Sequence, residues 1–208
     1  MRRPGMIRNI IFDLGGVIIK HRSDLMPFIV SSVFEIGPDA GKAIWKTHQH
    51  ALLTGELSSE GFLRKIKDEI GSRLPPQDLL ERWVSLYEHE GRVVNTALLK
   101  KITGLRRTYA VYLLTDTLDV HHAFNSARGL YGHFDGIYGS HLEGKSKSQG
   151  KDVFLHFLRK FRLTADECVF IDDLLPYIET AESVGIRGIR FTTVEKLEKD
   201  LKRIGVIL

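Results

Sequence analysis

Cysteine, long apolar runs and leader-like segments are scarce or missing in this chain of 208 residues. Its one cysteine, Cys168, cannot form an internal disulfide, which fits a reducing compartment. No apolar run approaches the roughly 20 residues that span a bilayer. The apolar stretch after residues 1–5 ends at Asp13, too soon for a signal peptide. We therefore expect a soluble, cytoplasmic protein with no membrane partner.

Blocks of one charge sign and nucleotide-binding loops are missing as well. The formal net charge is +4 and the pI is about 9.1, yet basic and acidic residues are interspersed along helical stretches such as 62–69. Interspersed charges are typical of solvated helix faces, so we expect no nucleic-acid partner. Neither a Gly-x-Gly-x-x-Gly nor a Walker-type loop occurs, which argues against nucleotide binding by those routes. A mild basic excess suits a small anionic substrate.

Short apolar runs alternate with amphipathic stretches through most of the chain. The runs rich in β-branched and aromatic residues predict buried strands at 10–12, 109–114, 137–138, 168–171 and 186–191. The amphipathic stretches predict helices at about 94–105, 118–128 and 151–161. They also predict two later helices, one that ends at residue 181 and a last one that ends at about residue 204. Repeated alternation of helix and strand predicts a doubly wound, three-layer α/β fold with a parallel sheet.

Residues 23–92 interrupt this alternation with helices alone. Capping and breaking residues predict four helices, which begin near Ser23, Gly37, Ser58 and Pro75. We expect an α/β core domain from residues 1–19 and 93–208, and a helical cap domain from residues 20–92. The tryptophans Trp45 and Trp83 fall on these helices, where they are expected to form the core of the cap.

Three of the predicted strands end in aspartate, at Asp13, at Asp116 and at the pair Asp172 and Asp173. Ligands bind beyond the carboxyl ends of strands in open parallel sheets, so these side chains converge if the strands are neighbours. Carboxylates that lie close together oppose one another's ionisation, which a bound cation relieves. Mg²⁺ is the usual hard cation where phosphate is also present. The alternative is that each aspartate only ends a strand or opens a turn.

Four short motifs occur in the order of a known hydrolase family. Residues 11–18, Ile-Phe-Asp-Leu-Gly-Gly-Val-Ile, are similar to its first motif, and residues 113–116 are similar to its second. Residues 170–173 are similar to its fourth motif, and residues 55–62 to a stretch common in its helical caps. The chain thus resembles the haloacid dehalogenase (HAD) superfamily over nearly its whole length. It is most similar to a subgroup with an Asp-Leu-Gly-Gly first motif, which includes sugar-phosphate phosphatases.

This resemblance implies a Mg²⁺-dependent hydrolase of a small phosphomonoester, such as a sugar phosphate. Asp13 would attack phosphorus and form an aspartyl-phosphate, which divides a difficult displacement into two easier steps. Thr115 would donate its hydroxyl to a phosphate oxygen. Asp172 and Asp173 would bind Mg²⁺ together with Asp13, and the backbone carbonyl of Gly15 would face the metal.

Further substrate contacts are implied less directly. In the basic loop after the third predicted strand, Lys147 is the best candidate to neutralise the phosphate, Lys145 is the next, and Lys151 stays open. Asp116 stands where the family usually has asparagine, so its charge should raise its own pKa or require more cation nearby. His121 lines the crevice or lies on a helix surface, and both alternatives stay open.

Gly15 is the main departure from the family pattern. Most phosphatases of the superfamily carry a second aspartate there as general acid and base, a role worth roughly 10² to 10⁴ in rate. His21 follows the first strand and is the preferred substitute, because imidazole exchanges protons near neutral pH. The alternative for His21 is an exposed loop residue.

Two other functions stay open. A metal-free dehalogenase also lacks the second aspartate, but the adjacent Asp172 and Asp173 favour a cation and argue against it. A catalytically silent binding protein could keep the fold after these changes, because fold does not imply function. The oligomeric state does not follow from the sequence.

Overall fold

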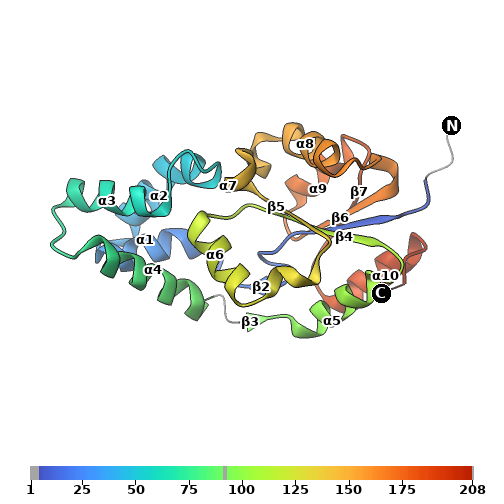
Figure 1. Cartoon of the computed structure of the whole chain (residues 1–208), viewed down its shortest axis with the longest axis horizontal. Helices are drawn as coiled ribbons and strands as arrows, with labels where there is room; N and C mark the ends of the chain where they lie inside the picture. The colour runs from blue at the N-terminus through green and yellow to red at the C-terminus, as the bar shows by residue number, and fades with distance from the viewer. Residues whose placement is uncertain (1–4, 91–92, 208) are drawn as a thin grey trace.

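A five-stranded parallel sheet forms the centre of the molecule (Figure 1). The structure is a computed structural model and describes residues 5–90 and 93–207. The strand order is β5-β4-β1-β6-β7, and every neighbouring pair is parallel. The strands are β1 (Asn9–Phe12), β4 (Ala110–Thr115), β5 (Gly136–Gly139), β6 (Cys168–Asp172) and β7 (Arg187–Arg190). The predicted doubly wound α/β class is confirmed.

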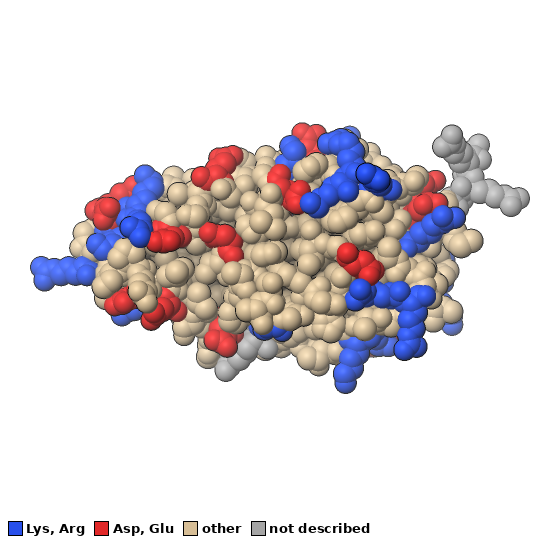
Figure 2. Space-filling view, in the orientation of Figure 1, with Lys and Arg blue, Asp and Glu red and all other residues tan. Residues whose placement is uncertain are grey.

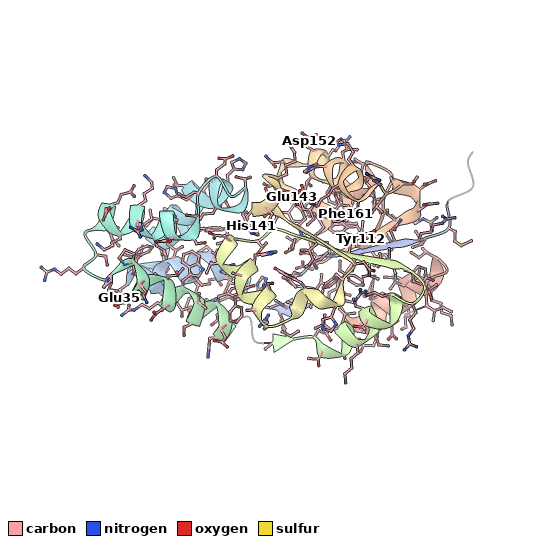
Figure 3. The ribbon with its side chains drawn as sticks, in the orientation of Figure 1. Glu35, Tyr112, His141, Glu143, Asp152 and Phe161 are labelled. Carbon is pink, nitrogen blue, oxygen red and sulfur yellow. The ribbon has the colours of Figure 1, made fainter. Side chains whose placement is uncertain are left out.

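Helices cover both faces of this sheet. On one face lie α5 (Thr96–Leu105) and α10 (Val194–Arg203), and on the other lie α8 (Lys151–Phe161) and α9 (Leu175–Glu182) (Figure 1). Side chains of β1 alternate between the two layers, as the strand repeat requires. Ile10 and Phe12 pack with α5 and α10, whereas Ile11 packs with α8 and α9. In the second layer, the rings of Tyr112 and Phe161 pack 4.8 Å apart (Figure 3).

Four helices form the cap beside the sheet. They are α1 (Leu25–Phe34), α2 (Pro38–Leu53), α3 (Ser59–Ile70) and α4 (Pro76–Glu90). The predicted capping of α3 is confirmed, because the Ser58 side chain accepts a hydrogen bond of 3.1 Å from the Gly61 N–H. The helices enclose their own apolar cluster around Phe62 and Trp83. Helix α6 (Asp119–Ala127) lies between the cap and the sheet, and the adjoining Leu118 belongs to the same cluster (Figure 1).

The two connections between the cap and the sheet lie side by side. Strand β2 (Ile19–Lys20) leads toward the cap, strand β3 (Val93–Val94) leads back, and the two pair antiparallel. The sequence did not predict this pair, because two residues are too few to show an alternating pattern. The division into residues 1–19 with 93–208 and residues 20–92 stays a prediction. Residues 1–4, 91, 92 and 208 lie outside the described residues.

Short turns complete the part that the structure describes. They are α7 (Ser140–Glu143) and three 3₁₀ turns, η1 (Leu130–His133), η2 (Lys147–Gln149) and η3 (Ala165–Glu167). Within residues 5–90 and 93–207, no helix combines the length and apolar character needed to cross a membrane. On the face shown in Figure 2, acidic and basic side chains lie side by side at the cap end and over α8, and the middle is mostly uncharged.

Candidate active site

The aspartates predicted to meet do lie at one edge of the sheet. Strands β4, β1 and β6 are adjacent, and their carboxyl ends carry Thr115, Asp13 and Asp172. Asp13 and Asp172 are buried, with 6% and 0% of their surfaces exposed, and Thr115 is buried beside them. Because parallel strands end together, three segments far apart in sequence supply one polar site.

Lys147 is held at the centre of this site. Its Nζ lies 2.9 Å from Asp13 Oδ1 and donates a hydrogen bond of 2.7 Å to Asp172 Oδ2. Its backbone N–H donates to Asp116 Oδ1 at 2.9 Å. The turn η2 places it there, because Ser146 and Gln149 form a capping box at the start of that turn.

Of the three candidate lysines, the structure brings only Lys147 to the strand ends. Lys145 follows the end of α7, where its backbone N–H donates to the Ser140 carbonyl at 3.2 Å. Lys151 is exposed at the first position of α8. Among the described residues, neither lysine lines the cavities of the site.

The site has more acidic than basic groups. Burial raises the pKa of Asp13 to about 7, the charge of Asp172 adds to this effect, and Lys147 opposes it. Burial also raises the pKa of Asp116 and of Asp173. Asp116 therefore shifts in the direction expected from the sequence, but burial and not a neighbouring charge is the main cause. For Lys147, burial favours the neutral amine, but the surrounding carboxylates outweigh it and raise the pKa.

Three of these carboxylates can share one cation. Asp13, Asp172 and Asp173 each offer an oxygen within 4.8 Å of the others, the one such group in the described part of the chain. Carboxylate oxygens are the ligands that Mg²⁺ prefers, so the donor set fits this ion. The predicted contribution of the Gly15 carbonyl stays a prediction.

The two glycines after Asp13 leave room for neighbouring side chains. Gly16 has a φ of 74°, and a Cβ there would collide with the Asp173 carboxylate. A Cβ on Gly15 would lie 2.7 Å from His21 Nε2. The His21 imidazole thus occupies the space into which a side chain at position 15 would extend. Its Nδ1 lies 2.9 Å from the Arg22 carbonyl oxygen.

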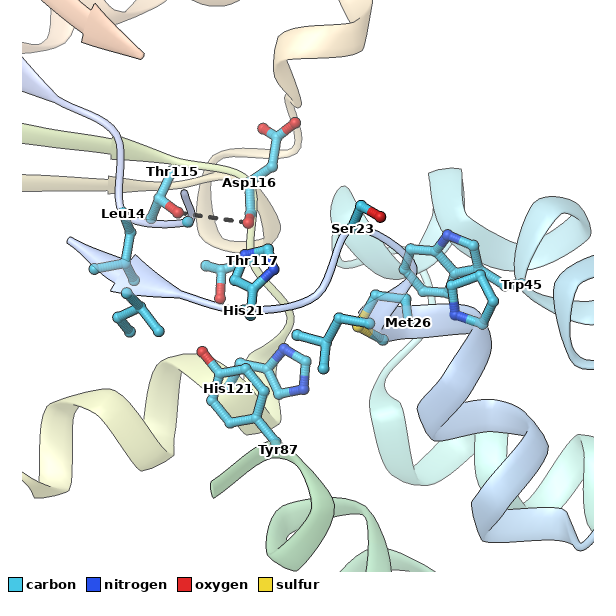
Figure 4. A pocket seen from close by; sticks show the side chains of 14 residues that line it. Leu14, His21, Ser23, Met26, Trp45, Tyr87, Thr115, Asp116, Thr117 and His121 are labelled. Atoms are coloured by element: carbon cyan, nitrogen blue, oxygen red, sulfur yellow. Dashed lines mark hydrogen bonds between the residues drawn. The ribbon is translucent and has the colours of Figure 1, made fainter. Parts of the chain in front are cut away.

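Two adjoining cavities open at the strand ends. The strand-end cavity has a volume of about 300 Å³ and is lined by Asp13, Lys147 and Asp173, among others. The cap cavity has a volume of about 240 Å³ and extends from the strand ends to α1 and α2 (Figure 4). The two share the following lining residues: Gly15, His21, Ser23, Thr115 and Asp116.

The cap cavity includes residues that the sequence did not point to. Met26 on α1, Tyr87 on α4 and Thr117 after β4 line it, and Tyr177 lines the strand-end cavity. Trp45 was expected in the core of the cap, but it lines the cap cavity and only its inner side packs on that core. The reason is that one side of α2 faces the cavity. The apolar periodicity of a single helix does not show whether an apolar side chain faces a core or a cavity.

His121 is fixed from two sides. It is buried and lines the cap cavity, which favours the crevice over the helix surface (Figure 4). Its Nε2 accepts a hydrogen bond of 2.9 Å from the indole N–H of Trp83, and its ring stacks on Tyr87 with centroids 3.7 Å apart. Burial lowers the pKa of His121 to about 3, and the charge of His21 adds to this, so the ring is neutral at physiological pH.

Comparison with known structures finds the same fold in HAD-like hydrolases. The structure of a predicted HAD-like family hydrolase from Porphyromonas gingivalis is similar with a TM-score of 0.78 and 25% identity, covering 96% of this chain and 98% of that chain. A HAD family enzyme from Bacteroides thetaiotaomicron, solved with magnesium and inorganic phosphate, has a TM-score of 0.76 at 20% identity, over 90% and 96% of the two chains. No protein-family model matches. In its fold and in the order of its motifs, the chain is similar to the HAD-like hydrolases.

Two relatives that are similar over most of their length are phosphatases. The chain is 27% identical over 192 residues to a D-ribitol-5-phosphate phosphatase from Bacteroides thetaiotaomicron, covering 86% of this chain and 89% of the relative. It is 25% identical over 188 residues to a sesquiterpene phosphatase from Aspergillus oryzae, covering 88% of each. The narrower subgroup with an Asp-Leu-Gly-Gly first motif stays a prediction.

Proposed function

We propose that the protein is a Mg²⁺-dependent phosphatase that hydrolyses a small phosphomonoester through an aspartyl-phosphate on Asp13. The observation that carries this proposal is the contact of one buried lysine, Lys147, with both Asp13 and Asp172 at the mouth of the strand-end cavity. The activities of the two relatives, which are both phosphatases, support it.

In the first step, a carboxylate oxygen of Asp13 attacks phosphorus and the bond from phosphorus to the alcohol oxygen breaks. Lys147 and the hydroxyl of Thr115 hold the phosphate oxygens, and their positive charge and N–H and O–H dipoles stabilise the developing charge. Thr115 is available for this role, because its side chain makes only a long hydrogen bond of 3.5 Å to the Asp116 carbonyl oxygen (Figure 4).

His21 supplies the proton that the departing alcohol needs. Its Nε2 lies 2.7 Å from the place of a Cβ at position 15, where the resemblance to the family implies a second aspartate. In the second step the same imidazole accepts a proton from the water that attacks the aspartyl-phosphate, which releases phosphate and restores Asp13. Histidine suits both steps, because an imidazole nitrogen can donate a proton and later accept one.

Mg²⁺ fits between the carboxylates of Asp13, Asp172 and Asp173, which offer oxygens within 4.8 Å of one another. When bound, the ion would reduce the repulsion between the anionic substrate and the anionic nucleophile. The acidic excess around Lys147 agrees with a site that needs one more cation, because the pKa values of Asp13, Asp116 and Asp173 are all raised without it. The cytoplasmic location expected from the sequence stays a prediction.

The test is turnover of a panel of phosphomonoesters by the purified protein, with Mg²⁺ and with chelator. We expect Mg²⁺-dependent release of phosphate, and a fall in kcat on the order of 10³-fold or more for Asp13→Asn. Asp68→Asn, at an exposed position on α3, is the matched control and should keep wild-type turnover. Acid quenching with a ³²P-labelled substrate should trap label on the wild type and none on Asp13→Asn.

Two results would reject the proposal in favour of the other functions. Halide release from haloacids that chelator leaves unchanged would indicate a dehalogenase. Absence of turnover across the panel, at saturating Mg²⁺ and with folded protein, would indicate a binding protein.

A further inference from the structure

The cap cavity offers almost no charge to a ligand. Among its described lining residues there is no lysine or arginine, and Asp116 is the one acidic residue. Asp116 is already paired, since it accepts a hydrogen bond from the Lys147 N–H, and burial raises its pKa. His21 is the one lining residue that can carry a positive charge besides the buried His121, and the proposed mechanism commits it to proton transfer. A substrate that carries a second anionic group beyond its phosphate would therefore find no other counter-charge here, and burial of an unpaired charge is costly.

Apolar side chains form most of the wall on the cap side. Leu25, Met26 and Pro27 come from the start of α1, and Trp45 comes from α2. Leu14 and Ile19 close the opposite side from the sheet. At about 240 Å³, the cavity lies below the range of about 300–1,000 Å³ typical of pockets for drug-sized ligands. The wall therefore suits a small apolar group.

His121 adds one hydrogen-bond donor of defined orientation. A neutral imidazole carries a single proton, and Nε2 cannot hold it because Nε2 accepts the indole N–H of Trp83. The proton is therefore on Nδ1. The stacking on Tyr87 fixes the plane of the ring, and Tyr87 is itself held by a 2.9 Å hydrogen bond from Asn125 Nδ2 to its hydroxyl. The ring thus presents a neutral N–H donor and no cation.

We infer that the cap cavity selects the alcohol part of the substrate, which is uncharged and mainly apolar, and that His121 Nδ1–H donates to a single oxygen on it. Trp83 is a positioning residue that fixes the tautomer of His121. This inference rests on the proposed function and names the substrate class. A polyol would leave those of its hydroxyls that face Leu25, Met26 and Trp45 without partners, and unmade hydrogen bonds in a buried site cost affinity.

Substrate ranking tests the chemistry of the cavity. We expect kcat/KM for phenyl phosphate to exceed that for a pentitol 5-phosphate by at least about tenfold, and that for 3-phosphoglycerate by about 100-fold. Trp45→Ala should reduce the preference for phenyl phosphate over the pentitol ester at least about fivefold. Lys46→Ala, an exposed neighbour on the same helix, should leave the ranking unchanged. Equal or faster turnover of the pentitol ester would overturn the inference.

Two-bond ¹H–¹⁵N correlation spectra test the role of Trp83 without any substrate. His121 should show the Nδ1–H tautomer, unchanged between pH 5 and 8, since its pKa is about 3. Trp83→Phe should admit the other tautomer and raise KM about three- to tenfold, with kcat nearly unchanged. An Nε2–H tautomer or an imidazolium in the wild type would overturn this part, whatever the stability of the variant.

Binding to Mg²⁺-loaded Asp13→Asn, measured by titration calorimetry, separates failure of the inference from failure of the proposed function. Tighter binding of phenyl phosphate than of the other two esters, without turnover by the wild type, would reject the phosphatase and keep the cavity assignment. Turnover with the pentitol ester or 3-phosphoglycerate bound most tightly would keep the phosphatase and reject the assignment.

Discussion

Asp13 is buried with a pKa of about 7, well above the value of about 3.9 for an aspartate in an unfolded chain. Between these two pH values the folded state binds more protons than the unfolded state, so the free energy of unfolding falls as pH rises. The raised pKa values of Asp116 and Asp173 act in the same direction. The site is thus arranged for ligand binding at a cost to the stability of the free protein.

We therefore predict that, in chelator, Asp13 contributes a fall in the free energy of unfolding between pH 5 and pH 8, on the order of 2–3 kcal/mol. His121, with its lowered pKa, contributes an opposite slope below about pH 6.5 in every variant, so the prediction is a difference between variants. Asp13→Asn should remove the Asp13 contribution, because an amide does not ionise. Urea unfolding at four pH values measures it, with Asp68→Asn as the control that keeps the wild-type slope. The same slope in wild type and Asp13→Asn would contradict the prediction.

His21 and Gly15 give a second prediction at this scale. His21→Ala should lower kcat by about 10²-fold, the lower end of what positioned proton transfer contributes. The double variant Gly15→Asp with His21→Ala should recover much of this loss, because removal of the imidazole frees the space beside position 15. Steady-state kinetics with Mg²⁺ measure both variants. Gly15→Asp in the presence of His21 is the control, since its new Cβ would meet the imidazole. Wild-type kcat in His21→Ala would contradict the role.

Residue identity alone predicted the ionic part of the site but not its cavity. Asp13, Thr115, Asp172 and Asp173 follow strand ends, and a parallel sheet brings strand ends together whatever the rest of the chain does. The choice of Lys147 depended on its position in a loop, and the sequence left two other lysines as alternatives. Met26, Trp45 and Tyr87 reach the cavity through the packing of the cap on the sheet, which no local pattern encodes.

At the scale of elements, α6 and α3 are joined across the boundary between sheet and cap. Ser59 donates its backbone N–H to the two carboxylate oxygens of Asp119 at 3.1 and 3.2 Å, and its hydroxyl also donates to Asp119. Asp119 thus places a negative charge at the N-terminus of α3, where the helix dipole favours it. Close to this junction, a Cβ on Gly55 would collide with the backbone carbonyl of His141, which lies between cap and sheet (Figure 3).

We predict that Asp119→Asn lowers the free energy of unfolding by about 1–2 kcal/mol, because a charged acceptor for buried donors is lost. Thermal or urea unfolding measures the change. Asp152→Asn is the matched control, since Asp152 is an exposed acid in the first turn of α8 and should cost only a few tenths of a kcal/mol (Figure 3). Equal effects of the two substitutions would show that the contact between α6 and α3 contributes nothing of its own.

The strands and helices themselves were largely predictable from the sequence. The apolar runs gave all five strands of the sheet, and the capping residue Ser58 gave the start of α3. Strands β2 and β3 could not be predicted, because each has two residues and its partner lies more than 70 positions away in the chain. Their pairing depends on the cap and the sheet being already in place.

At the scale of the whole molecule, residues outside the cap complete the apolar cluster of the cap. Leu118 lies within this cluster, and Val120 and Phe124 of α6 pack against it. We predict that Phe62→Ala, which removes a fully buried ring beside Trp83, lowers the free energy of unfolding by about 3–5 kcal/mol. We also predict that the cap and the sheet unfold in a single transition.

Two optical signals can measure this cooperativity separately. Both tryptophans, Trp45 and Trp83, lie in the cap, so fluorescence reports on the cap alone, whereas far-UV circular dichroism reports on all helices. The two unfolding curves should coincide in the wild type and in Phe62→Ala. A fluorescence transition at lower urea than the dichroism transition would show that the cap unfolds independently.

The paired strands β2 and β3 have a mechanical consequence. Both chain crossings lie in one two-stranded ribbon, so a movement of the cap that breaks its contacts with α6 must also twist that ribbon. His21 is the residue directly after β2, and Gly15 forms a bridge with Ile19 at its other end. Such a movement would therefore also displace the His21 imidazole relative to Asp13, so that access of the ester and delivery of the proton would change together.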